Sequence, residues 1–154
     1  MRPVSYTHLP GTRAITNAEL LAAPVDVLVP AALENQITGG NAGTVQASLI
    51  LEAANGPVSP EADEILARKG VTIVPDIIAN AGGVTVSYFE WVQDLQSFFW
   101  EEKEINERLE HIMTASFETA WEASQHLGVP LRLGAYTIAV QRVAEATSAR
   151  GIYP

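Results

Sequence analysis

The chain has 154 residues, 47% of them hydrophobic, which is enough for one domain with its own core. Its 18 Asp and Glu residues outnumber nine Lys and Arg residues, and the net charge of −9 argues against nucleic acids and anionic membranes as partners. There is no cysteine, the three scattered histidines offer no metal site, and no apolar run approaches the roughly 20 residues of a membrane span, so we expect a cytoplasmic protein.

The first part of the chain alternates short helices with apolar strands. Thr16 and Glu19 have the spacing of a capping box, which predicts a short helix to about Ala22. The apolar residues 25–30 follow and indicate a buried strand. A further helical turn is expected within residues 41–47.

Two more apolar segments, at 48–54 and 71–75, predict a second and a third strand with a helix between them. Ser59 and Pro60 are typical of an N-cap and a first helical turn, and Gly70 ends that helix. Apolar strands separated by helices favour a parallel sheet covered by helices on both faces. We therefore expect an α/β fold, a Rossmann-like three-layer α/β/α fragment with parallel strands, followed by C-terminal helices.

No strand signal appears beyond Gly82, and the rest of the chain is predicted to be helical. Three helices are expected, at about 83–99, 102–127 and 135–149, and Gly128 stops the second. Their apolar stripes predict core packing and contact with a neighbouring domain rather than a cofactor role. The charged run around Glu104 is expected to be a solvated face, with Arg108 placed for an ion pair one turn later.

Residues 80–91 are the most informative stretch, and they read NAGGVTVSYFEW directly after the third predicted strand. Two glycines, Gly82 and Gly83, let backbone approach a ligand closely, and the helix then carries a lone hydroxyl at Ser87. In open α/β sheets ligands bind at the carboxyl ends of the strands, so this segment predicts a binding site.

Two parts of a complete dinucleotide-dependent enzyme are not found in the sequence. No GxGxxG or GxGxxA fingerprint follows a strand, and the glycines of residues 39–43 have the wrong spacing and are expected to form a loop. The two lysines, Lys69 and Lys103, lack the apolar setting that tunes a lysine for acid–base work. We therefore expect no catalytic residue in this chain.

Three motifs carry a family resemblance: PAALENQI at 30–37, EAANGPVSPEAD at 52–63, and the segment at 80–91. Together they closely resemble the glutamate dehydrogenases of the Glu/Leu/Phe/Val dehydrogenase family, from about Ile15 onward. The resemblance implies that residues 14–154 are the C-terminal portion of an NAD(P)-binding Rossmann domain, helical from about residue 82. It also implies an N-terminally truncated enzyme, with residues 1–13 as an unmatched segment.

The resemblance implies roles for individual residues at the cofactor edge. Ala31 and Ala32 would line the cofactor crevice, Asn55 would lie against the nicotinamide ribose and ring, and Asn80 would fix the carboxamide. Plainer roles are also open for these residues. They are strand-end packing for the alanines, a turn for Asn55 and a helix cap for Asn80.

At the substrate edge, Gly82 and Gly83 match glycines that admit the nicotinamide ring and the substrate. Ser87 matches a serine that hydrogen-bonds the distal carboxylate of glutamate, although an ordinary helical serine is the alternative. Such a bond contributes about 1.5–3 kcal/mol, enough to favour glutamate but not to supply the whole specificity.

The implied parent enzyme oxidises glutamate to 2-oxoglutarate and ammonia with NAD or NADP, as a homo-oligomer that in this family is typically a hexamer. The sequence does not indicate which cofactor is used. Two alternatives stay open: a non-catalytic oligomerising or regulatory subunit of the same fold, and a dehydrogenase of leucine, phenylalanine or valine. Ser87 argues against the second alternative.

Overall fold

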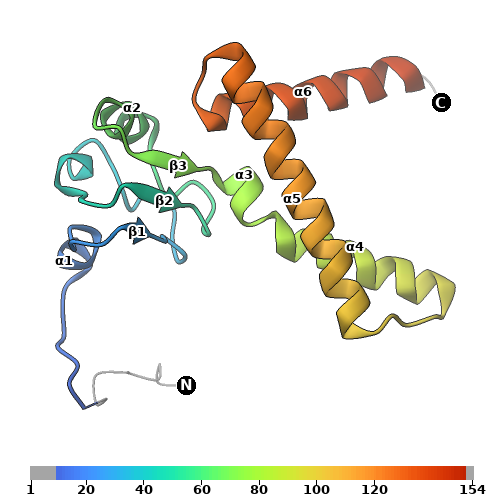
Figure 1. Ribbon diagram of the computed structural model, residues 1–154, viewed down its shortest axis with the longest axis horizontal. Helices are drawn as coiled ribbons and strands as arrows, with labels where there is room; N and C mark the ends of the chain where they lie inside the picture. Colours follow the sequence, from blue (N-terminus) through green and yellow to red (C-terminus); the bar gives the residue numbers. More distant parts are fainter. Residues whose placement is uncertain (1–9, 152–154) are drawn as a thin grey trace.

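A computed structural model describes residues 10–151, so residues 1–9 of the segment expected to be unmatched lie outside the described part (Figure 1). Its elements in chain order are α1 (Asn17–Leu21), β1 (Val27–Leu28), the 3-10 turn η2 (Ala42–Thr44), β2 (Leu49–Leu51), α2 (Pro60–Arg68), β3 (Thr72–Val74), α3 (Asp76–Ala79), α4 (Ala81–Gln96), α5 (Glu102–Leu127) and α6 (Leu131–Arg150). No helix within residues 10–151 combines the length and the apolar character needed to span a membrane.

The three strands form one parallel sheet in the order β1-β2-β3. Ile50 of β2 is paired with Leu28 of β1 on one side and with Ile73 of β3 on the other. These three residues face the main core, where α1, η2 and α2 contribute buried side chains such as Leu66. The α/β fold with parallel strands and flanking helices confirms the predicted Rossmann-like class.

The second face of the sheet is covered only in part. Val74 of β3 packs against the cluster that α3, α5 and α6 form around Ala120. Val25, Val27 and Val29, however, are each more than 40% exposed, because no described helix crosses this face beside β1. The prediction of a buried first strand in a sheet covered on both faces was therefore wrong for the face that carries these valines, while Leu28 on the other face is buried.

Local capping signals place several helices as predicted. Thr16 and Glu19 form the capping box of α1, and the Ser59 side chain accepts a hydrogen bond from the backbone of Ala62 at the start of α2. The long helix α5 has the predicted bounds, and Gly128 ends it with a φ of 64°, in the left-handed region that glycine adopts without strain.

Two helix starts differ from the prediction. The chain turns into the short helix α3 directly after Pro75, and α4 already begins at Ala81, so both glycines of the motif lie in its first turn. The last helix begins at Leu131 rather than near Ala135, because Pro130 has extended backbone that suits the position before a helix.

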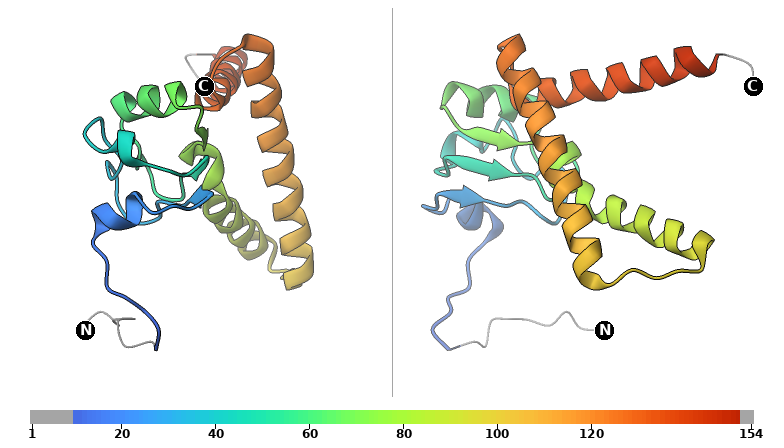
Figure 2. Two further views of the ribbon diagram at one scale, coloured as in Figure 1. Left: turned by 60° about the vertical axis from the view of Figure 1, so that its left-hand side comes forward. Right: turned by 45° about the vertical axis from the view of Figure 1, so that its right-hand side comes forward.

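Helices α5 and α6 are joined by a short turn and diverge from it at a wide angle, and they pack against the sheet near this turn (Figure 1). Beyond its first turns α6 extends away from the rest of the chain, as Figure 2 shows in two views. Tyr136, Val140 and Val143 are between 44% and 68% exposed there. Core packing by this stripe, which the sequence predicted, is not found within the described residues.

Candidate functional site

The carboxyl ends of the three strands bring three loops together. Ala54, after β2, donates its backbone N–H to the carbonyl of Pro30, after β1, at 2.9 Å. Ala31 and Ala32 follow Pro30 and are exposed at this edge. Asn80, after β3, reaches the carbonyl of Ala53 at 3.4 Å. The structure thus places the four predicted cofactor-side residues at one edge of the sheet, although no described contact joins the two alanines to the asparagines.

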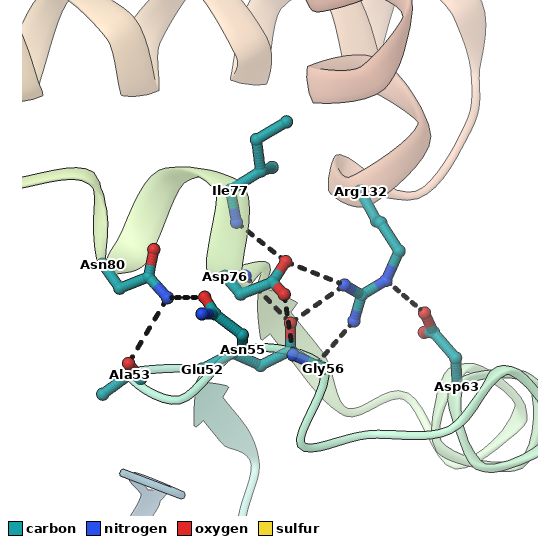
Figure 3. A network of polar contacts seen from close by, with 9 residues as sticks. All are labelled: Glu52, Ala53, Asn55, Gly56, Asp63, Asp76, Ile77, Asn80 and Arg132. Atoms are coloured by element: carbon teal, nitrogen blue, oxygen red, sulfur yellow. Dashed lines mark hydrogen bonds and ion pairs between the residues drawn. The ribbon is translucent and has the colours of Figure 1, made fainter. Parts of the chain in front are cut away.

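Asn55 and Asn80 are in direct contact (Figure 3). The amide Nδ2 of Asn80 donates to Oδ1 of Asn55 at 2.6 Å, and Asn55 is exposed while Asn80 is half-buried. Within residues 10–151, Nδ2 of Asn55 and Oδ1 of Asn80 take part in no described hydrogen bond. The pair therefore offers one donor and one acceptor, which is the complement of a primary carboxamide.

Asn80 occupies the N-cap position of α4, and Asn55 lies in a bend directly before Gly56, so both plainer roles stay open by position. Asn80 stands between α3 and α4, but its side chain makes no capping hydrogen bond to α4. The residue after Asn55 in this bend is Gly56, whose φ of 54° lies in the left-handed region. The amide of Asn80 is thus oriented by Asn55 and Ala53, that is, by the neighbouring loop.

A layer of buried charge supports this edge. Glu52 follows β2, is fully buried, and accepts the backbone N–H of Asp76 at 2.9 Å. Asp76 in turn accepts the backbone N–H of Gly56 at 2.8 Å and that of Ile77 at 2.8 Å. The loop that carries Asn55 and the helix turn that leads to Asn80 are therefore tied to each other through two carboxylates.

Arg132, in the first turn of α6, neutralises part of this layer (Figure 3). Its guanidinium makes two hydrogen bonds to Glu52, at 2.8 and 2.9 Å, and one to Asp63 at 2.6 Å, and lies 3.7 Å from Asp76. Burial lowers the pKa of Arg132, but hydrogen bonds and charge from Glu52 and Asp63 outweigh burial and raise it above its ordinary value.

Arg132 and its carboxylate partners were not predicted from the sequence. Glu52 and Arg132 are 80 residues apart, and no local pattern connects them. One signal was present, because a carboxylate directly after an apolar strand is buried only when a cation or several donors compensate it. That signal predicts a partner without saying which of the seven arginines supplies it.

A pocket of about 670 Å³ opens beside the same cluster, between the loop after β2 and the first turn of α6. Its charged lining consists of one arginine and four carboxylates, which are Glu34, Asp63, Glu64 and Asp76. This balance disfavours a phosphate group. Asn55 and Asn80 do not line the pocket, so we place the candidate site at the amide pair and not there.

Ser87 lies on α4, seven residues after Asn80, which corresponds to two turns or about 10 Å along a helix. It is exposed, and its hydroxyl donates to the carbonyl of Gly83 at 3.2 Å. The Ser87 position is therefore on roughly the same side of α4 as Asn80, and no described hydrogen bond joins the two side chains. The single hydroxyl proton must leave the Gly83 carbonyl before it can be donated to a ligand.

Gly82 and Gly83 are not explained by the packing of the described residues. Neither has a positive φ, and a Cβ at Gly83 would meet nothing within 4 Å, while at Gly82 it would make an ordinary contact with Leu109. Each glycine destabilises a helix by about 0.5–1 kcal/mol relative to alanine. The described residues therefore give no packing reason for two adjacent glycines in this turn.

The remaining predictions about the site concern the lysines and the glycine-rich loop. Lys69 donates to the carbonyls of Gly43 and Val45, and Lys103 forms an exposed pair with Glu107. Residues 39–41 form a turn that leads into η2, and residues 42 and 43 belong to η2 itself, within the helical turn expected at 41–47. Within residues 10–151 no group of His, Asp or Glu is arranged to hold a metal ion.

Comparisons with known proteins agree in their result. A family model described as Glutamate/Leucine/Phenylalanine/Valine dehydrogenase matches residues 3–151. A glutamate dehydrogenase from Thermotoga maritima is 55% identical over 94% of the chain, and an NAD-specific one from Staphylococcus aureus is 52% identical over 89%. An NADP-specific glutamate dehydrogenase from Halobacterium salinarum is 53% identical over 93% of the chain.

The structural comparison gives the same family. A hetero-hexameric glutamate dehydrogenase from Thermus thermophilus, solved in a Leu-bound form, superposes with a TM-score of 0.89 and 38% identity over 94% of this chain and 35% of that one. The three curated relatives are covered over 35%, 33% and 34% of their own length. The chain thus spans about a third of each relative that it matches.

Proposed function

The chain belongs to the Glutamate/Leucine/Phenylalanine/Valine dehydrogenase family, and from this premise we propose that it forms the nicotinamide side and part of the substrate side of a glutamate dehydrogenase. The reaction proposed for the whole enzyme is the oxidation of L-glutamate to 2-oxoglutarate and ammonia with NAD or NADP. Relatives of both cofactor specificities are similar to this chain to nearly the same degree, so the proposal covers either cofactor.

One observation carries the proposal: within residues 10–151 the Asn55–Asn80 pair leaves one donor and one acceptor without a described hydrogen bond. A carboxamide presents one N–H₂ group and one carbonyl oxygen side by side, and Oδ1 of Asn80 and Nδ2 of Asn55 complement them. A carboxylate would offer two acceptors and no donor. The pair thus suits a nicotinamide and not the corresponding acid.

The residues of this chain would hold and orient the cofactor and the substrate, while the cofactor, when bound, would accept a hydride. Ala31 and Ala32 leave the edge after β1 open for the cofactor, since neither side chain extends beyond a methyl group. Gly82 and Gly83 leave the first turn of α4 open for the ring and the substrate. Proton transfer is assigned to no residue here, because both lysines are engaged in exposed or backbone contacts.

For substrate recognition we assign Ser87 to the distal carboxylate of glutamate. The hydroxyl is exposed, and its hydrogen bond of 3.2 Å to Gly83 is long for an O–H donor, so exchange for a charged acceptor is favourable. A dehydrogenase of leucine, phenylalanine or valine would have no use for this donor. That alternative is therefore less favoured, as is a purely non-catalytic subunit, which would need neither Ser87 nor the amide pair.

We also propose that the whole enzyme is a homo-oligomer, with a hexamer as the family's typical form. The solved relative from Thermus thermophilus is described as hetero-hexameric, which supports an oligomer without deciding whether its subunits are identical. The exposed apolar stripe of α6 is suited to a contact within such an assembly. The cytoplasmic location expected from the sequence stays a prediction.

A chimera tests the proposed function. Residues 14–151 of this chain replace the matching segment of the Thermotoga maritima enzyme, and the purified chimera is assayed with glutamate and with NAD and NADP. The proposal predicts glutamate turnover with at least one cofactor and a lower efficiency with leucine, phenylalanine and valine. A chimera that assembles like its parent but oxidises no glutamate, or that prefers an apolar amino acid, contradicts the proposal.

A further inference from the structure

We propose that Arg132 is a positioning residue for the Asn55–Asn80 pair, holding the two segments that carry these asparagines at the separation at which one carboxamide spans both. The inference rests on the proposed function for its meaning. Whether Arg132 positions the two asparagine side chains can be tested without any ligand.

The guanidinium of Arg132 connects several elements of the fold. Arg132 extends from α6 to carboxylates on three other elements: Glu52 after β2, Asp63 on α2 and Asp76 on α3. Two parallel hydrogen bonds to Glu52, at 2.8 and 2.9 Å, fix the plane of the guanidinium as well as its distance. A residue of α6 thus helps to fix the positions of the loop after β2 and of the start of α3.

Glu52 and Asp76 in turn bind backbone N–H groups of the segments that carry the two asparagines. Glu52 uses the same Oε2 atom for Arg132 and for the backbone N–H of Asp76. Asp76 accepts the backbone N–H of Gly56, the neighbour of Asn55 in the chain. Asp76 also opens α3, one helical turn before Asn80. Apart from the hydrogen bonds of the Asn80 side chain to Asn55 and Ala53, the side-chain ties drawn between the two asparagine segments in Figure 3 run through Glu52 or Asp76.

The charges in the cluster around Arg132 are not balanced. Three carboxylates surround one guanidinium, and the side chain of Glu52 is fully buried while those of Arg132 and Asp76 are less than 20% exposed. Without the cation, Glu52 and Asp76 would repel each other in a setting that water reaches poorly. Because they sit on the two segments in question, their separation would pull Asn55 away from Asn80.

Asp63 provides a matched control. It pairs with the same guanidinium at 2.6 Å, but its described side-chain contacts reach neither the loop after β2 nor α3. Asp63→Asn removes one charge from the cluster and leaves both ties between the asparagine segments in place. A second control is Leu131→Ala, which destabilises the same turn of α6 through a buried apolar side chain.

The test follows the side-chain amide signals of Asn55 and Asn80 by nitrogen–proton NMR in the full 154-residue chain. In the wild type, Asn80 should show a hydrogen-bonded amide proton that is shielded from exchange with water. Arg132→Met should shift both amides toward exposed asparagine values and speed exchange of the Asn80 proton by about tenfold or more. Arg132→Lys should lie in between, since an ammonium restores charge but not the bidentate geometry.

The controls decide between positioning and general stability. Asp63→Asn and Leu131→Ala should keep both amide signals near their wild-type positions, even where they lower the melting temperature. Unchanged amide signals in Arg132→Met, or equal changes in Leu131→Ala, would overturn the proposal. If Arg132→Met does not fold, the comparison of Arg132→Lys with Asp63→Asn decides in the same way.

A kinetic measurement in the chimera adds a readout that stability alone does not move. Arg132→Lys should raise the KM for the cofactor about tenfold with a smaller effect on kcat, whereas Asp63→Asn should leave that KM unchanged. An inactive chimera would count against the proposed function, while the ligand-free amide signals still decide the role of Arg132. The two failures are therefore distinguishable.

Discussion

The amide of Asn80 donates to the side chain of Asn55 across 2.6 Å, and this hydrogen bond uses one atom of each amide. Because Nδ2 of Asn80 is used internally, its Oδ1 is left as an acceptor and Nδ2 of Asn55 as a donor. Two loops that follow different strands thereby act as one recognition unit. The proposed recognition of a carboxamide therefore needs both loops and not one asparagine alone.

Gly134 is predicted to be required for the close contact between α5 and α6. A Cβ at this position would lie 2.8 Å from the carbonyl oxygen of Ala120 and from the backbone nitrogen of Ser124. Gly134→Ala should force the helices apart and destabilise the chain by about 1–3 kcal/mol, measured as a lower midpoint of urea unfolding. Gly83→Ala is the matched control, since the added methyl group meets nothing within 4 Å and should leave stability equal or slightly higher.

A midpoint for Gly134→Ala that equals the wild type would show that the helices are packed less closely than described. A loss of stability in Gly83→Ala would show that the first turn of α4 has a constraint that its open surroundings do not reveal.

The exposed apolar surface predicts self-association of the isolated chain. Val25, Val27 and Val29 line an uncovered part of the sheet, and Phe98 and Phe99 after α4 are 65% and 72% exposed. Patches of this kind are usually contact surfaces. Sedimentation velocity at rising concentration should show association, and replacing the three valines by threonine should reduce it. A compact monomer that unfolds cooperatively at all concentrations would contradict this prediction.

Ser87 is predicted to select for glutamate. In the chimera, Ser87→Ala should lower the efficiency with glutamate by about ten- to a hundredfold, as follows from losing roughly 1.5–3 kcal/mol, and should hardly affect norvaline. Thr85→Ala is the control, because Thr85 makes the same kind of hydrogen bond, to the carbonyl of Ala81, in the same helix. An unchanged ratio of glutamate to norvaline efficiency in Ser87→Ala would reduce Ser87 to an ordinary helical serine.

The isolated 154-residue chain is expected to show no glutamate dehydrogenase activity. Its sequence has no glycine fingerprint for a pyrophosphate, and its two lysines are placed for backbone or surface contacts. Purified protein assayed with glutamate and each cofactor should therefore give no turnover. Activity that persists after removal of host dehydrogenases would refute this expectation.

Local chemistry explains which parts of the fold could be predicted from the sequence. The capping box of Thr16 and Glu19, the Ser59 cap and the stop at Gly128 each depend on residues a few positions apart. The starts of α3 and α6 were missed or misplaced because prolines precede them, and a proline before a helix reads equally well as a loop.

For the site, the sequence predicted residues but not their contacts. Asn55 and Asn80 were identified through family motifs, yet their hydrogen bond joins loops that are 25 residues apart. The cluster around Arg132 was missed because its partners are 69 and 80 residues away in the chain. The exposure of the valines beside β1 was also unpredictable, since an apolar strand looks the same whether or not a helix covers it.

We propose that the amide pair binds the carboxamide of nicotinamide. Titration of the chain with nicotinamide mononucleotide and, separately, with nicotinic acid mononucleotide tests this directly. These two ligands differ only in the group that the pair is proposed to contact. The side-chain amide signals of Asn55 and Asn80 should shift with the first ligand, and the second should bind about tenfold more weakly or worse, because a carboxylate offers no donor to Oδ1 of Asn80. Equal responses to both ligands, or shifts that spare these two amides, would contradict the claim.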